Sequence, residues 1–179
     1  MPAPFRGTRA IALSGVVVVT MYAALAAVQI LVLNPLAAVP GLTLDEIDAE
    51  MSSRGEDIGE AAVLIILGIG VALAVAVALV SIGLRWRPLS TASAFFALLV
   101  LGAPAYFLAS FGPGMALADA FAISGADASP WALPLYAVSL LAVAGLVVSV
   151  VWAVVGAVRP VTAFVNNLPD SSPDVVRRR

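Results

Sequence analysis

The sequence contains no cysteine and no histidine, and all nine of its basic residues are arginine. These absences exclude Cys/His zinc sites, Fe–S clusters, haem ligation by histidine, Ser-His-Asp triads and disulfides. Charged residues of either sign are also scarce, at 11% of the 179 residues. The chain is instead rich in apolar residues, with 62% hydrophobic residues and a mean hydropathy of +1.08. From the missing cysteine and histidine we expect no metal site and no cofactor. The bias towards Arg, Ala, Val and Leu favours a GC-rich bacterial genome.

Four long stretches contain no Asp, Glu, Lys or Arg. They are 10–44, 61–84, 88–118 and 128–158. An apolar helix of about 20 residues, rising about 1.5 Å per residue, is long enough to cross a hydrocarbon core of about 30 Å. The pattern predicts an all-α integral membrane protein, a bundle of four transmembrane helices. The predicted spans are about 10–33, 61–84, 90–111 and 133–158.

Prolines and glycines mark the expected ends of these spans. Asn34-Pro35 is expected to stop the first helix and Arg159-Pro160 the fourth, because proline disfavours helical geometry in the residue before it. Gly102-Ala103-Pro104 is expected to interrupt the third helix, and Gly112-Pro113-Gly114 to end it. A cleavable signal peptide is the alternative for the first span, since Ala24-Leu25-Ala26 resembles a cleavage site. The apolar run is, however, longer than a signal h-region of about 7–15 residues.

The few charges are distributed unevenly between the connections. With four spans, eight of the nine arginines fall on the side of the two termini, and Arg54 falls on the other side. Nine of the eleven acidic residues fall with Arg54, which gives this side a formal charge of −8 and the terminal side +6. The positive-inside rule then predicts an N-in, C-in protein of the cell (plasma) membrane. Residues 1–165 are expected to form one membrane domain, and the polar residues 166–179 a disordered cytoplasmic tail.

The first outer connection contains the pattern of a short amphipathic helix over about Leu44–Ser52. Thr43 followed by Glu46 matches the capping box at a helix start. Leu44, Ile47 and Met51 then recur on one face, with acidic residues on the others. The spacing of the acids fits no EF-hand loop. We expect Leu44, Ile47 and Met51 to be a candidate contact for a protein partner.

The second outer connection contains a shorter apolar segment, Met115–Ile123, between two glycine-containing turns. About nine residues are too few to span a bilayer, so an interfacial or re-entrant helix is expected here. Asp119 is its one carboxylate. An ionisable group that enters a membrane is a functional candidate, and the alternative is a carboxylate that simply reaches the outer water.

Small residues recur every four positions within two spans. Because lipid provides no hydrophobic drive for helix association, close packing through small residues supplies much of it. In the fourth span the predicted packing seam is Gly145, Ser149, Ala153 and Ala157. In the second span two such rows lie side by side: Gly68, Ala72 and Ala76, and Gly70, Ala74 and Ala78. The sequence leaves open whether the seam packs within one chain or between chains.

Polar side chains inside the spans are few, and no charged residue lies in the middle of any span. This counts against proton relays and ion-coupled transport, which usually use such groups. Gln29 is expected to tie the first span to a neighbour, because a buried amide needs several partners. Tyr22 and Tyr106 lie deep in their spans and are expected to form hydrogen bonds within the bundle.

These features favour a non-catalytic polytopic membrane protein that acts as an accessory, assembly or sensing component of a membrane complex. Its expected partners are the lipid bilayer and other membrane subunits or a second copy, and no nucleic acid. The alternative is a small transporter or channel subunit that forms a pathway by oligomerising, with the Gly102-Pro104 break and residues 112–125 as its sites. An enzyme is a third alternative, with Asp119 or Asp127 as its acid.

Overall fold

The computed structural model describes the backbone of residues 4–166 and the side chains of residues 7–156. All regular structure in this part of the chain is helical. Four helical segments in it are long and apolar enough to cross a membrane. They are Gly7–Ala38, Glu60–Gly83, Pro88–Phe121 and Ala132–Gly156. The all-α class and the four apolar spans predicted from the sequence are therefore confirmed, and they indicate a multi-pass membrane protein.

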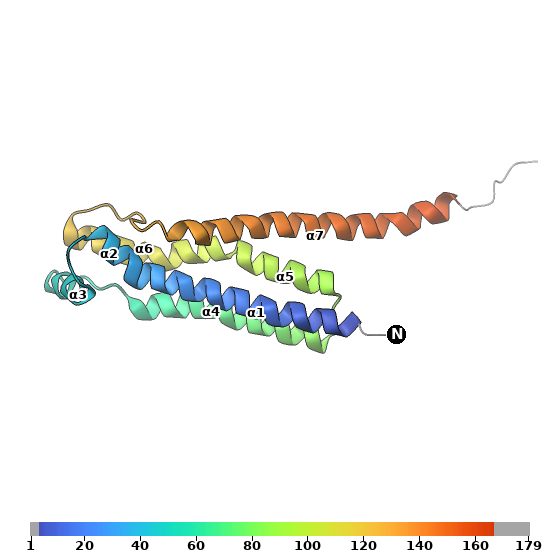
Figure 1. The fold of residues 1–179 in the computed structure, drawn as a ribbon, viewed down its shortest axis with the longest axis horizontal. Coiled ribbons are helices and arrows are strands. Elements are labelled where there is room, and N and C mark those ends of the chain that lie inside the picture. Colours follow the sequence, from blue (N-terminus) through green and yellow to red (C-terminus); the bar gives the residue numbers. More distant parts are fainter. Residues whose placement is uncertain (1–3, 167–179) are drawn as a thin grey trace, which may run out of the picture.

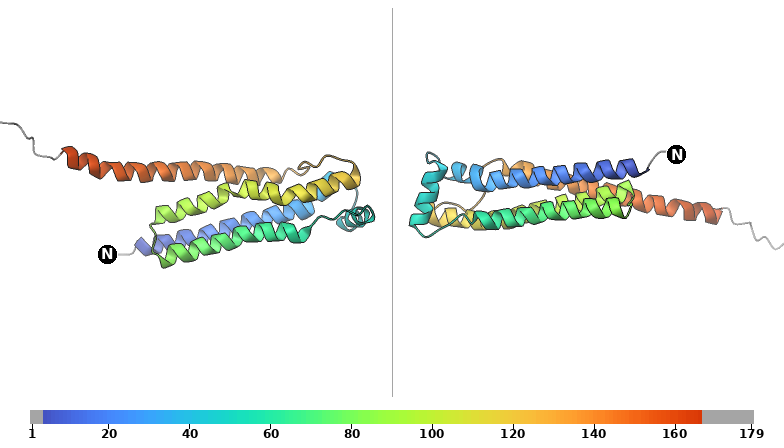
Figure 2. Two further views of the ribbon diagram at one scale, coloured as in Figure 1. Left: turned by 180° about the vertical axis from the view of Figure 1, so that it is seen from behind. Right: turned by 90° about the horizontal axis from the view of Figure 1, so that it is seen from below.

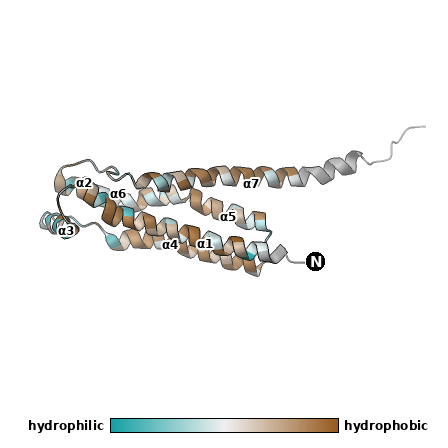
Figure 3. Cartoon of the chain, in the orientation of Figure 1, coloured by the Kyte–Doolittle hydropathy of each residue, from teal (hydrophilic) through white to brown (hydrophobic). Residues whose placement is uncertain are grey.

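The four segments run side by side in alternating directions (Figure 1). Short helix α3 (Leu44–Ser53) lies crosswise over one end of them (Figure 2). We call this end, with α3 and the connection 122–131, the loop end, and the end that carries Pro4 the terminal end. Hydrophobic residues predominate along the four segments, whereas hydrophilic residues gather on α3 (Figure 3).

The first span is longer than expected, because the chain does not stop at Asn34-Pro35. It consists of α1 (Pro4–Val28), a π-helical turn η1 (Gln29–Leu33) and α2 (Asn34–Ala38). In the π turn the N–H of Asn34 donates to the carbonyl of Gln29. Pro35 therefore falls in the first turn of α2, a position where helices tolerate proline. The expected helix stop is wrong for this reason.

The second span, α4 (Glu60–Gly83), packs mainly on α1. Of its two rows of small residues, one faces the bundle, with Ala74 and Ala78 buried. Gly68 and Ala72 belong to the other row and are exposed on the outer surface. Both rows have small residues at steps of four, so the sequence pattern does not distinguish the buried row from the exposed one.

The third span is broken where the sequence predicted, into α5 (Pro88–Val100) and α6 (Gly102–Phe121). The expected end at Gly112-Pro113-Gly114 is wrong, since α6 runs through it to Phe121. Proline inside a helix removes one hydrogen bond but need not end the helix, and membrane helices tolerate it where neighbours cover the freed groups. The glycine after it lets the 122–131 connection come close, because a Cβ on Gly114 would lie 2.6 Å from the carbonyl oxygen of Gly125.

The fourth span belongs to α7 (Ala132–Asn166), which continues past the expected stop at Arg159-Pro160. Its 35 residues correspond to about 52 Å at about 1.5 Å per residue. It extends beyond the other helices at the terminal end (Figure 1). The tail predicted to be disordered lies outside the described residues, apart from Asn166, the last residue of α7.

Two aromatic rings of α5 pack on glycines of neighbouring helices. A Cβ on Gly15 would lie 2.4 Å from the ring of Phe95, and one on Gly145 would lie 2.8 Å from the ring of Phe96. The glycines let these rings, both on α5, reach the backbones of α1 and α7. Many large apolar side chains of the four spans are exposed on the outer surface of the bundle, as expected for a surface that faces lipid.

Candidate functional site

Among the described residues, most side-chain hydrogen bonds between separate elements lie at the loop end. The first element of this end is α3. The Thr43 N–H donates to Glu46 Oε2 at 2.7 Å, and the Glu46 N–H donates to Thr43 Oγ1 at 3.3 Å. This is the capping box predicted from the sequence, and α3 is one residue longer than the predicted helix. The hydrogen bonds from the Thr43 backbone and hydroxyl lower the pKa of Glu46 below its ordinary value.

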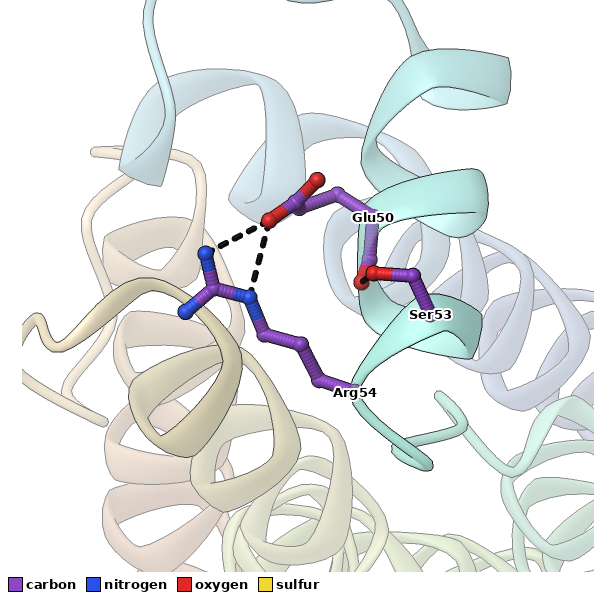
Figure 4. A network of polar contacts seen from close by, with 3 residues as sticks. All are labelled: Glu50, Ser53 and Arg54. Atoms are coloured by element: carbon purple, nitrogen blue, oxygen red, sulfur yellow. Dashed lines mark hydrogen bonds and ion pairs between the residues drawn. The ribbon is translucent and has the colours of Figure 1, made fainter.

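An exposed ion pair between Glu50 and Arg54 lies at the C-terminal end of α3. The Arg54 Nε–H donates to Glu50 Oε1 at 2.8 Å, and Ser53 Oγ donates to the Glu50 carbonyl (Figure 4). Both charged side chains are well exposed, so a pair four residues apart on a helix contributes only about 0.3–0.5 kcal/mol. Arg54 is the one arginine that the charge distribution places on the acidic side of the protein.

The apolar face of α3 packs on the same chain. Ile47 and Met51 are buried, in one cluster with Ala116, Leu117 and Ala120 of α6. Leu44, the third residue of the expected partner contact, is only partly exposed. In this conformation Ile47 and Met51 are not available to a partner, because the last turns of α6 cover them. Sequence periodicity gave the face of α3 but not what lies against it.

The last turns of α6 are also the segment for which a separate interfacial or re-entrant helix was expected. That expectation is wrong, because residues 115–121 continue α6, and Ala122 ends it with a positive φ of 55°. Asp119 is exposed. It lines an open recess of about 300 Å³ together with Glu56 and Asp57. Among the described residues, no group of three acidic residues lies close enough to hold a metal ion.

A buried polar network fixes the 122–131 connection to the first span. Gln29, the first residue of the π turn, is fully buried, and its Nε2–H donates to the Ser129 carbonyl at 3.4 Å. Asn34 Oδ1 accepts from the N–H of Ala128 at 2.8 Å and from that of Ser129 at 3.4 Å. Gln29 thus ties the first span to a neighbour, as expected, but this neighbour is a connection rather than a span. The Oε1 atom of Gln29 is buried without a hydrogen-bond partner in the described part of the chain.

The same connection is held from the other side by tyrosines. The Tyr106 hydroxyl of α6 donates to Asp127 Oδ1 at 2.7 Å, and the Tyr136 hydroxyl of α7 donates to Oδ2 at 3.4 Å. The two rings meet edge to face, with centroids 5.5 Å apart. A hydrogen bond to a charged acceptor contributes about 1.5–3 kcal/mol. Asp127 thus joins α6 and α7 at the loop end.

The network positions backbone rather than a reacting group. Both oxygens of Asp127 already accept a phenolic hydrogen bond, and the amide of Asn34 accepts from backbone N–H groups. Tyr22 lies deeper, where its hydroxyl lies 3.4 Å from Ser139 Oγ. The expected hydrogen bonds of Tyr22 and Tyr106 within the bundle are confirmed. The geometry therefore supports a fixed cap over the spans.

The predicted seam on α7 is divided between two environments. Gly145 packs on the Phe96 ring, and Ser149 is buried with its hydroxyl donating to the Gly145 carbonyl at 2.8 Å. Ala153 is exposed, and the side chain of Ala157 lies outside the described residues. The seam is therefore intramolecular over its first half.

Sequence reasoning missed the clamp around Asp127. The signal was present, since two of the three tyrosines lie on the helices that flank the 122–131 connection. Their shared acceptor was not visible, because it depends on how α6 and α7 are placed. No protein-family model, curated protein or solved structure matches this chain.

Proposed function

We propose that this chain is a non-catalytic polytopic membrane protein that serves as an accessory, assembly or sensing component of a membrane complex. The observation that carries the proposal is an uncovered stretch of α7, Val150–Gly156. From Val150 to Gly156 every described side chain is exposed, whereas Ala142 and Ser149 earlier on the helix are buried. A membrane helix with a small-residue face left uncovered is suited to pack on another helix.

The contact face on this part of α7 continues the covered seam. Ala153 follows Gly145 and Ser149 at steps of four residues, so it lies near the same side of the helix. The large exposed side chains around it include Trp152 and Val154. A partner helix that approaches Ala153 closely meets apolar side chains on both sides, which suits a membrane subunit or a second copy of this chain.

The proposal includes a position in the plasma membrane of a bacterium, with both termini cytoplasmic. Its support is the charge distribution, because arginines concentrate at the terminal end and acidic residues at the loop end. A cysteine introduced at Ser53 or Ser124, both exposed at the loop end, should react with an impermeant thiol reagent in intact cells. A cysteine at Ser90, exposed near the terminal end, should not react. Reversed reactivity contradicts the orientation.

A transporter or channel subunit is the alternative, with the break at Gly102 and residues 112–125 as its sites. The side chains beside this break support it less well. They are apolar apart from the Tyr22 hydroxyl, which lies 3.4 Å from Ser139 Oγ, and a pathway for polar solutes needs polar groups along it.

The function is tested at Ala153. A photoreactive side chain placed at 153 in the full chain should crosslink to another membrane subunit or to a second copy, and one at Val151 on the opposite side should crosslink mainly to lipid. Ala153→Phe should lower recovery of that companion in mild detergent, because overpacking forces helices apart. The matched control Val151→Phe should leave recovery unchanged. Crosslinking to lipid alone at both positions contradicts the proposal.

A further inference from the structure

The break in the third span creates an apolar groove in the side of the bundle. The groove has a volume of about 230 Å³ and lies between α1, α4 and the α5–α6 break. Two glycines shape it. Gly102 lets the Tyr22 ring lie against the break, since a Cβ there would be 2.8 Å from the ring, and Gly70 leaves its stretch of the α4 wall without a side chain.

The groove lies about halfway along the spans. Gly70 is about 15 Å along the helix axis from Glu60 and about 20 Å from Gly83, at about 1.5 Å per residue. Ile69, Leu73, Leu101 and Leu108 line the groove and are exposed on the side of the bundle. The groove therefore opens sideways, at a depth where a spanning protein is surrounded by hydrocarbon.

The lining selects an apolar occupant. The lining side chains are apolar except for the Tyr22 hydroxyl, which lies 3.4 Å from Ser139 Oγ outside the groove. A water molecule needs two to four polar partners, and an apolar cavity of about 150 Å³ stays dry but binds small hydrocarbons. The groove is larger than that and has an open side, so a long chain can enter from the bilayer and extend out of it.

We propose that this groove binds one hydrocarbon chain of a membrane lipid. The bound hydrocarbon chain would contact two walls of the groove. Leu98 and Leu99 of α5 form one wall, and Ile66 and Leu67 of α4 form the other. Contact on several sides favours a bound chain over one that only touches the outer surface of the bundle. No residue of α7 lines the groove, so this proposal does not depend on the proposed partner contact at Ala153.

The test uses the full chain in phosphatidylcholine vesicles that contain a fatty acyl chain with a mid-chain diazirine. After illumination, adducts on groove residues such as Leu98 and Leu108 are compared with adducts on Leu64 and Leu79, which are exposed outside the groove. The expected result is an excess of adducts in the groove. Gly70→Phe should lower this ratio at least about fivefold, because the ring occupies the space of the chain.

Gly68→Phe is the matched control. Nothing lies within 4 Å of a Cβ added at Gly68 or at Gly70, so neither ring starts against a neighbour, and only Gly70 lines the groove. Leu73→Trp, at the mouth, should lower the ratio as well, with Leu64→Trp as its control, in case Gly70→Phe does not fold. Equal ratios in all folded variants overturn the proposal, and so does a groove that crosslinks to a second protein chain instead of lipid.

Discussion

Helix α7 runs through both ends of the bundle and meets different surroundings at each. At the loop end Tyr136 of α7 shares Asp127 with Tyr106 of α6, and Leu135 is fully buried. The connection before α7 is held by Asn34 and Gln29 of the first span. This end of α7 is therefore held by a buried side chain and by a hydrogen bond to the connection that precedes it.

At the terminal end α1 and the α4–α5 connection are joined by the hydroxyl of Thr8, which donates to the Trp86 carbonyl at 2.9 Å. The described part of α7 leaves this set of helices and exposes Val150 through Gly156. The loop end of α7 is thus held by buried side chains and hydrogen bonds, whereas its stretch Val150–Gly156 is exposed. This is why the loop end is a cap and the open half of α7 is the proposed contact.

The largest change is expected from Ile47→Asp at the loop end. A carboxylate cannot stay in the dry contact between α3 and α6, so α3 should separate from α6. Burying each of Ile47 and Met51 contributes about 1.5–3 kcal/mol, so about 3–6 kcal/mol of docking free energy should be lost. Hydrogen exchange of α3 peptides measures this loss. Ala49→Asp adds the same charge on an exposed face and should leave exchange near that of the parent.

The covered and open halves of α7 should respond differently to the same substitution. Gly145→Leu places a side chain against the Phe96 ring and should lower the free energy of unfolding by about 1–3 kcal/mol. Ala153→Leu, on the open half, should change it by no more than about 0.5 kcal/mol in the purified monomer. Leu141→Ala, whose side chain is 71% exposed, should also have little effect. Thermal unfolding in detergent measures all three, and equal losses would remove the distinction between the halves.

Loss of one hydrogen bond of the tyrosine clamp should have an effect no larger than that of Gly145→Leu. Tyr106→Phe removes the hydrogen bond to Asp127 Oδ1 and keeps the ring, so about 1.5 kcal/mol of stability should be lost. Tyr136→Phe should cost less, because its hydrogen bond is longer and more exposed. Chemical unfolding compares them. If both variants match the parent, the 122–131 connection is held by Gln29 and Asn34 alone.

The smallest effect is expected from acidification. The pKa of Glu46 is lowered in the folded protein, so its contribution to stability is present above its ordinary pKa of 4.5 and is lost as the pH falls through the lower folded value. The Thr43 amide resonance should titrate in this range below pH 4.5 in labelled protein. Glu46→Gln should abolish the titration. A Thr43 amide that titrates equally in Glu46→Gln reports some other group.

Several elements follow from local rules alone. The four spans follow from the absence of charge over about 20 residues or more, and α3 follows from Thr43, Glu46 and the spacing of Ile47 and Met51. The break at Gly102 follows from glycine and proline in sequence. The same rules failed at Pro35 and Pro113, where the helix continues. At Pro35 a π turn precedes the proline, and at Pro113 neighbouring segments cover the proline, so the helix continues in both cases.

The sequence by itself determined the class of protein, the number of apolar spans, the start of α3 and the need of Gln29 for a neighbour, because these depend on length, composition and hydrogen-bond need. Only the tertiary structure decided that Ile47 and Met51 face α6, that Tyr106 and Tyr136 share Asp127, and that the seam is covered at Gly145 but open at Ala153. Periodicity gives the face of a helix that is apolar or small. What covers that face depends on where helices distant in sequence lie.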